Sequence, residues 1–366
     1  MNALLHEVRR NRLLWLLVFV PAVLAAERLV PASHTLLFLL SVLAIVPLAA
    51  LLSHATESVA AKTGDAVGGL LNATLGNLTE LVIAVTALRA GQYMLVKASI
   101  AGAIVTNSLF MLGASFLLGG LRHHAQEYNR ANARLQAGML LLATVALLVP
   151  SAIAAADATR GAAVAQDLSV GLAVLLLVTY GLGMWFSLRT HPEEFASAHA
   201  SGGEEGEAPW PMGLALATLA GVTVLVALVS EIFVASVQKA AGDFGMSPAF
   251  VGFVVVALVG AAAEMASAFA GARKNRLDLS VGIALGSASQ IALFVAPVLL
   301  LLSYVLGPTP MDLMFWPGAV VMIFLSTLTV SMVTSSGRSA WFVGVLLIMV
   351  YAVFATTLYL LPPRAP

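Results

Sequence analysis

Eleven runs of about twenty mostly apolar residues follow one another along this chain, and they constrain its fold more than any other feature. The hydrocarbon core of a bilayer is about 30 Å thick, and a helix of about 20 apolar residues crosses it. The sequence therefore predicts an all-α integral membrane protein with about eleven transmembrane helices. The expected spans are 13–31, 35–54, 66–88, 94–120, 135–155, 167–188, 211–236, 247–271, 279–305, 312–334 and 340–361.

The composition agrees with a chain whose main solvent is lipid. Of its 366 residues, 60% are hydrophobic and 10% are charged, against roughly 25% charged in soluble proteins. The formal net charge of zero gives no indication of a nucleic-acid partner. The absence of cysteine excludes disulfides and thiolate metal sites.

The first apolar run, Leu13 to Ala26, follows Arg9, Arg10 and Arg12, an order that signal peptides share. Because ten further apolar runs follow, we interpret it as the first span.

Lysine and arginine predict the orientation, because they concentrate on the cytoplasmic side. With the N-terminus inside, the twelve inner cations are Arg9, Arg10, Arg12, Lys62, Arg122, Arg130, Arg134, Arg189, Arg273, Lys274, Arg276 and Arg338. The six outer ones are Arg28, Arg89, Lys97, Arg160, Lys239 and Arg364. This bias predicts a cytoplasmic N-terminus and an external C-terminus. The Ala, Leu and Arg content favours a bacterial inner membrane.

One polar segment, 191–209, contains five glutamates and divides the chain. It could be a solvated connector or a regulatory cation-binding loop. We expect an N-terminal region with the first span (1–34), a first five-helix repeat (35–190), this acidic cytoplasmic linker (191–209) and a second five-helix repeat (210–366).

A short internal similarity supports the two repeats. The segments 48–62 and 225–239 align without a gap and share five identical residues. Five spans per half is an odd number, so the halves have opposite orientations. Inverted repeats are common in secondary transporters, whose binding site lies near the midplane between them.

Most acidic residues lie in loops or near the ends of the expected spans, but two glutamates do not. Glu80 follows a glycine in GNLTEL, and Glu264 follows one in GAAAEM. Each precedes an arginine, Arg89 or Arg273, by nine residues, which is roughly 13 Å of helix. The two arginines mark opposite membrane faces, so we expect both carboxylates near the midplane.

A charged carboxylate in lipid costs at least about 2.5 kcal/mol, so it needs protein, water, a proton or a cation beside it. Asn77 and Thr79 lie close to Glu80, and Asn107, Ser287 and Gln290 lie in small, polar stretches of later spans. Packing between helices is the alternative role for each hydroxyl. Hard oxygen ligands suit Ca²⁺, or less readily Mg²⁺ or Na⁺.

Two carboxylates match the charge of one divalent cation. Once the cation leaves, two ionised groups would repel each other, and protonation would relieve that repulsion. The sequence thus predicts that cation and protons compete for Glu80 and Glu264, with no cofactor besides the transported ions.

At these residues the sequence resembles the calcium/proton exchanger family, within the wider cation/Ca²⁺ exchanger superfamily. The matching stretches are GNLTELVIAVTALRAG with KASIAGAIVTN, and FVGFVVVALVGAAAEM with ARKNRLDLSVGIALGSASQIALFV. The resemblance implies one helix plus five plus five, and exchange of Ca²⁺ for protons at Glu80 and Glu264. It also implies that Asn77, Asn107, Ser287 and Gln290 support the ion.

The second motif departs from the family pattern, which is close to GNAAEH, because Ala261 and Met265 replace its Asn and His. This opens the alternative of Na⁺ or another cation. Thr79 and Ala263 stand where the sodium/calcium branch has proline, which favours proton coupling. A passive cation channel and an intramembrane enzyme using His123 and His124 are weaker alternatives. The oligomeric state is not predicted.

Overall fold

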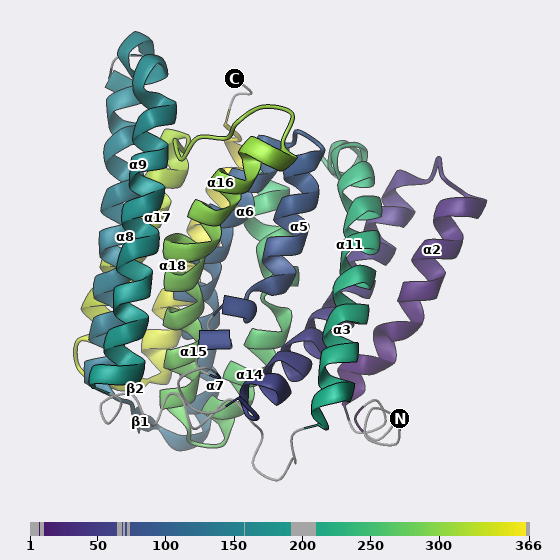
Figure 1. Ribbon diagram of the computed structural model, residues 1–366. Helices are drawn as coiled ribbons and strands as arrows, with labels where there is room; N and C mark the ends of the chain where they lie inside the picture. The colour runs from purple at the N-terminus through teal and green to yellow at the C-terminus, as the bar shows by residue number, and fades with distance from the viewer. Residues whose placement is uncertain are drawn as a thin grey trace.

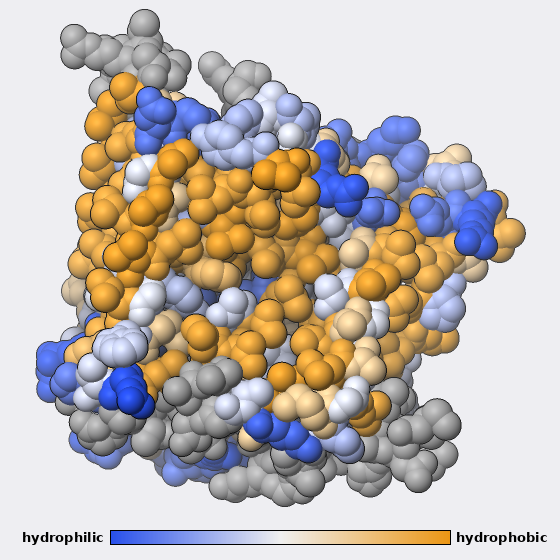
Figure 2. Space-filling model, in the orientation of Figure 1, coloured by the Kyte–Doolittle hydropathy of each residue, from blue (hydrophilic) through white to orange (hydrophobic). Residues whose placement is uncertain are grey.

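The structure is a computed structural model that describes residues 7, 11–63, 68, 70–71, 74–156, 158–191 and 210–363. Figure 1 shows a bundle of helices, and Figure 2 shows a broad apolar band on this face, with hydrophilic atoms above and below it. The elements, in chain order, are the 3₁₀ helix η1 (Arg12–Val18), α2 (Phe19–Leu29), α3 (His34–Ala60), α5 (Leu78–Arg89), α6 (Tyr93–Val105), the π-helix η2 (Thr106–Met111), α7 (Leu112–His123), β1 (Ala125–Glu127), α8 (Arg130–Ala156), α9 (Ala158–Trp185), the π-helix η3 (Phe186–Thr190), α11 (Met212–Asp243), α12 (Pro248–Phe250), the π-helix η4 (Val251–Val256), α13 (Ala257–Gly260), α14 (Ala262–Arg273), α15 (Leu277–Gln290), the π-helix η5 (Ile291–Val295), α16 (Ala296–Leu306), α17 (Pro317–Thr334), β2 (Arg338–Ala340) and α18 (Trp341–Leu360).

Within the described ranges, eight helices are long and apolar enough to cross a bilayer, and a bent pair raises this number to nine. These eight correspond to the expected spans 35–54, 94–120, 135–155, 167–188, 211–236, 279–305, 312–334 and 340–361. The mostly helical membrane architecture is therefore confirmed. The total of eleven spans and the inverted repeat stay predictions.

Three expected spans differ from single long helices. The run 13–31 begins as the 3₁₀ helix η1 before it continues as α2. The run 66–88 contains the twelve-residue α5, and only part of the chain before α5 is described. The run 247–271 bends by 58° between Gly260 and Ala262. Of the predicted acidic linker, residues 192–209 lie outside the described residues.

Small residues allow the helices around the centre to approach closely. A Cβ atom on Gly102 of α6 would lie 2.2 Å from the backbone oxygen of Phe253 in η4. A Cβ atom on Gly344 of α18 would similarly lie 2.4 Å from the backbone oxygen of Gly113 in α7. Such backbone contact is the usual role of glycine between membrane helices. The contact at Gly102 places α6 directly against η4, which precedes the bend before α14.

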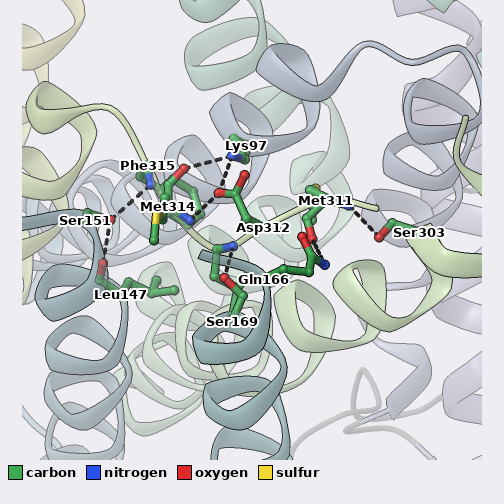
Figure 3. Close-up of polar contacts among 11 residues, drawn as sticks. Lys97, Leu147, Ser151, Gln166, Ser169, Ser303, Met311, Asp312, Met314 and Phe315 are labelled. Carbon is green, nitrogen blue, oxygen red and sulfur yellow. Dashed lines mark hydrogen bonds and ion pairs between the residues drawn. The ribbon is translucent and has the colours of Figure 1, made fainter. Parts of the chain in front are cut away.

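The connection between α16 and α17 is fixed by polar side chains from several helices (Figure 3). Lys97 of α6 donates to Asp312 Oδ1 at 2.7 Å and to the Met314 carbonyl at 2.8 Å. Hydroxyl oxygens of Ser151, Ser169 and Ser303 accept from the backbone N–H groups of Phe315, Leu313 and Met311. This connection is therefore an ordered cap over one end of the bundle.

A two-stranded antiparallel sheet lies at the opposite end of the bundle (Figure 1). β1 pairs with β2 so that Ala125 faces Ala340 and Glu127 faces Arg338. The sheet joins the α7–α8 connection to the α17–α18 connection.

Candidate functional site

Both intramembrane glutamates lie in the first turn of a helix that follows an interruption of the chain. Glu80 is in the first turn of α5, whose N-cap is Asn77. Glu264 is in the first turn of α14, directly after the bend at Ala261. The N-terminus of a helix carries a partial positive charge and free N–H groups, which stabilise an adjacent carboxylate. The sequence signal for these interruptions was the glycine that precedes each glutamate.

The Glu80 side chain lies against the second interruption, close to Glu264 in the chain. A Cβ atom on Gly260 would lie 2.9 Å from Glu80 Cγ and 3.1 Å from Glu80 Oε1, so the Glu80 side chain rests on the last residue of α13. Glu264 follows four residues later, within electrostatic range of the Glu80 carboxyl group. The contact between Gly260 and Glu80 was not predicted from the sequence, because it joins two distant segments of the chain.

Four polar side chains beside the glutamates form a continuous chain of hydrogen bonds. Asn107 Nδ2 donates to Ser287 Oγ at 2.8 Å, and Ser287 Oγ donates to Asn77 Oδ1 at 2.7 Å. Asn77 Nδ2 donates in turn to Gln290 Oε1 at 2.7 Å. Ser287 also lies within reach of the Glu264 carboxyl group. The structure thus brings these four predicted residues together from three separate segments of the chain.

Thr79 is the exception among the predicted residues. It is buried on α5, next to Glu80 in sequence, but it takes no part in this chain of hydrogen bonds.

Three oxygen atoms at this site are buried and accept no hydrogen bond from any described residue. They are Glu80 Oε1, Glu264 Oε2 and Asn107 Oδ1. Buried polar atoms in folded proteins almost always have partners, so each exception needs an explanation. A set of three free oxygens, two of them from carboxyl groups, could accept protons or coordinate a hard cation.

Irregular helix geometry surrounds the same site. The π-helix η2 begins one residue before Asn107, η5 begins directly after Gln290, and η4 lies two elements before α14. π-helical turns occur frequently at functional sites. Sequence analysis did not predict them, because no residue type signals a π-turn.

A small cavity of about 10 Å³ lies beside Glu80. Ser99 is the other polar side chain in its lining, which is otherwise formed by apolar residues of α5, α6, η4, α13, η5 and α16. The site is therefore asymmetric, with amides around Asn77 and mainly apolar groups on this side of Glu80. Ala261 and Met265, which replace the polar residues of the family pattern, are both buried.

No group of three or more His, Cys, Asp or Glu side chains suited to a metal occurs in the described part of the chain.

The model of the sodium/calcium exchanger protein family matches residues 33–189 and 214–360. The chain belongs to this family. A Ca²⁺/H⁺ antiporter of Aphanothece halophytica is 39% identical over 359 residues, with 95% of this chain and 96% of the relative covered. The Ca²⁺/H⁺ antiporter ChaA of Bacillus subtilis is 37% identical over 354 residues, with 96% and 100% covered.

The fold of this chain matches that of a solved structure. The crystal structure of the selenium-substituted Ca²⁺/H⁺ antiporter protein YfkE superimposes with a TM-score of 0.81 at 33% identity, covering 96% of this chain and 100% of that chain. The resemblance predicted from the two glutamate motifs is confirmed. These relatives are named as transporters and not as enzymes.

Proposed function

We propose that this protein is a secondary antiporter that exchanges Ca²⁺, or a related cation, for protons at a site formed by Glu80 and Glu264. The observation that supports this most strongly is the approach of the Glu80 side chain to the interruption that precedes Glu264, where each carboxyl group and Asn107 have one buried oxygen without a hydrogen bond from a described residue. The names of the relatives support Ca²⁺ as the cation.

Exchange follows from the cost of leaving the site empty and charged. Each ionised carboxylate inside the membrane costs at least about 2.5 kcal/mol without a partner, and two close together also repel each other. A divalent cation removes both costs, and so do protons. The states that can cross between the two sides are therefore the cation-loaded and the protonated ones, which couples the two fluxes.

Alternating access would come from two inverted halves around this site. The family model matches one segment on each side of the predicted linker, which supports two halves. Glu80 and Glu264 each follow an interruption and each precede an arginine by nine residues, which supports their equivalence. The bacterial relatives support a location in a bacterial inner membrane. The distribution of Lys and Arg supports a cytoplasmic N-terminus and an external C-terminus.

Na⁺ or another cation is the second candidate substrate. Ala261 and Met265 remove an amide and an imidazole from the surroundings of Glu264, so fewer ligands compensate for the dehydration of a divalent cation. A monovalent ion loses less hydration and needs fewer ligands.

The test is cation-dependent proton flux in proteoliposomes, with Ca²⁺, Na⁺, K⁺ and Mg²⁺ supplied separately. The proposal predicts proton release on addition of one preferred cation, and loss of that flux in both Glu80→Gln and Glu264→Gln. Glu231→Gln is the matched control, because Glu231 is an exposed glutamate paired with Arg89 at 4.0 Å, away from the site. Cation uptake without proton movement would contradict the proposal and indicate a passive channel.

A further inference from the structure

Five exposed cations gather at the end of the bundle that carries the two-stranded sheet. This basic patch consists of Arg122 on α7, Arg130 and Arg134 on α8, Arg273 on α14 and Lys274 after it. Figure 2 shows hydrophilic atoms below the apolar band at the lower left, where Figure 1 places β1 and β2.

Hydrogen bonds join the elements that carry the patch. His123 Nε2 lies 3.0 Å from the backbone oxygen of Arg273. The buried Gln126 of β1 donates to the Ala272 carbonyl at 3.0 Å and to Asn275 Oδ1 at 2.9 Å. These contacts join the end of α7 and β1 to the α14–α15 turn. The elements that carry these cations are therefore held together at this end of the bundle.

Carboxylates of the described residues do not neutralise the patch. Among the described residues, none of its five members has a carboxylate within ion-pair distance. The nearby Glu127 pairs with Arg338 at 3.1 Å, and Asp278 accepts from the backbone N–H of Asn129.

Arg89 occupies the position that corresponds to Arg273 in the first half of the chain, and it has a carboxylate partner. Arg89 follows Glu80 by nine residues, as Arg273 follows Glu264, and Arg89 has Glu231 at 4.0 Å. Within the described ranges, Arg89 therefore has a carboxylate as its counter-charge, whereas Arg273 in the basic patch has none.

Large apolar side chains are exposed beside the patch. Leu121 on α7 is 64% exposed, and Trp341 and Phe342 at the start of α18 are 45% and 55% exposed. A Cβ atom on Gly120 would lie 2.4 Å from the backbone nitrogen of Trp341, so α7 and α18 touch at this end. Exposed aromatic residues next to cations mark the level of the lipid headgroups. A free phosphate ion would use the cations alone, whereas a phospholipid would use both surfaces.

We propose that the basic patch binds the phosphate groups of anionic phospholipids, while Leu121, Trp341 and Phe342 contact the acyl chains. Basic pockets between membrane helices recognise anionic headgroups through this combination of charge and apolar contact. The proposal depends on surface charge and exposure, so it stands independently of the transported ion.

The test measures lipid binding to the purified full-length protein in neutral detergent. The thermal unfolding midpoint is followed while phosphatidylglycerol or phosphatidylcholine is added, and native mass spectrometry counts the bound lipids. We expect at least a tenfold tighter binding of phosphatidylglycerol, weakened by added salt. The triple substitution Arg130→Gln, Arg273→Gln and Lys274→Gln should abolish this preference, whereas Arg89→Gln should retain it.

Two controls are included. Water-soluble phosphates show whether the patch binds phosphate alone, and a single substitution replaces the triple variant if that variant does not fold. Inorganic phosphate or glycerol 3-phosphate should not reproduce the stabilisation, and equal stabilisation by either would overturn the lipid assignment. If the triple variant does not fold, Lys274→Gln alone should weaken the preference about two- to threefold. Equal binding of both lipids by the unmodified protein, or a preference unchanged in the folded variants, would refute the proposal.

Discussion

The substitution Gly260→Ala tests whether the position of the Glu80 carboxyl group matters for transport. The added Cβ would lie 2.9 Å from Glu80 Cγ and 3.1 Å from Oε1, where an ordinary contact begins at 3.4 Å. The side chain must therefore move by about 0.5 Å at Cγ and about 0.3 Å at Oε1, the differences between these values. Because Glu80 can rotate about its own bonds, we expect a cost of only about 1 kcal/mol in folding free energy.

The displacement of Glu80 Oε1 is large compared with the tolerance of metal–oxygen distances. Ca²⁺–oxygen distances span about 2.3–2.6 Å, so a shift of about 0.3 Å equals the whole range. We expect the apparent affinity for the cation to fall about tenfold, which corresponds to about 1.4 kcal/mol.

The assay compares cation-dependent proton flux over a range of cation concentrations with the thermal unfolding midpoint. Gly286→Ala is the matched control, since Gly286 adjoins Ser287 on α15 but no atom lies within 4 Å of its added Cβ. If Gly260→Ala transports like the unmodified protein, or if both substitutions act equally, the reasoning about this contact is wrong.

Three further substitutions test the packing and the polar contacts. Gly102→Ala places a Cβ 2.2 Å from the backbone oxygen of Phe253, which cannot rotate away, so we expect a loss of about 3 kcal/mol and a lower thermal unfolding midpoint. Lys97→Ala leaves the partly buried Asp312 without its 2.7 Å partner and should cost about 1–3 kcal/mol, against at most about 1 kcal/mol for an exposed pair. An unchanged midpoint in either variant would contradict these estimates of packing and pairing. Ser287→Ala removes two hydrogen bonds from the chain that joins Asn107 to Gln290. We expect about tenfold weaker cation binding in equilibrium dialysis. Unchanged binding would show that this chain of hydrogen bonds does not support the cation.

The apolar runs predicted most of the long helices, because lipid imposes length and hydropathy on a span directly. Eight expected spans have counterparts of sufficient length in the described residues. A glycine precedes each glutamate, and the structure has an interruption next to each of these glycines. The family resemblance named Asn77, Asn107, Ser287 and Gln290, and the structure joins these four by hydrogen bonds.

Other features depend on contacts between distant segments, which no local pattern contains. The run 247–271 is apolar on both sides of Glu264, so hydropathy alone could not reveal the 58° angle of its bend. The contact between Glu80 and Gly260 joins residues 180 positions apart in the sequence, and the ion pair Lys97–Asp312 joins residues 215 positions apart. The π-helices next to Asn107 and Gln290 likewise arise from packing and not from residue type.

The number of protons released when the cation binds tests most directly whether Glu80 and Glu264 share one occupant. Calorimetric titration of the purified protein with Ca²⁺ in buffers of different ionisation enthalpy measures this number. Competition at one site predicts release of up to about two protons per cation near the pH at which the apo site is protonated, and weakened binding in Glu80→Gln and Glu264→Gln. Cation binding that releases no proton at any pH, or binding that is unchanged in both variants, would contradict a shared site.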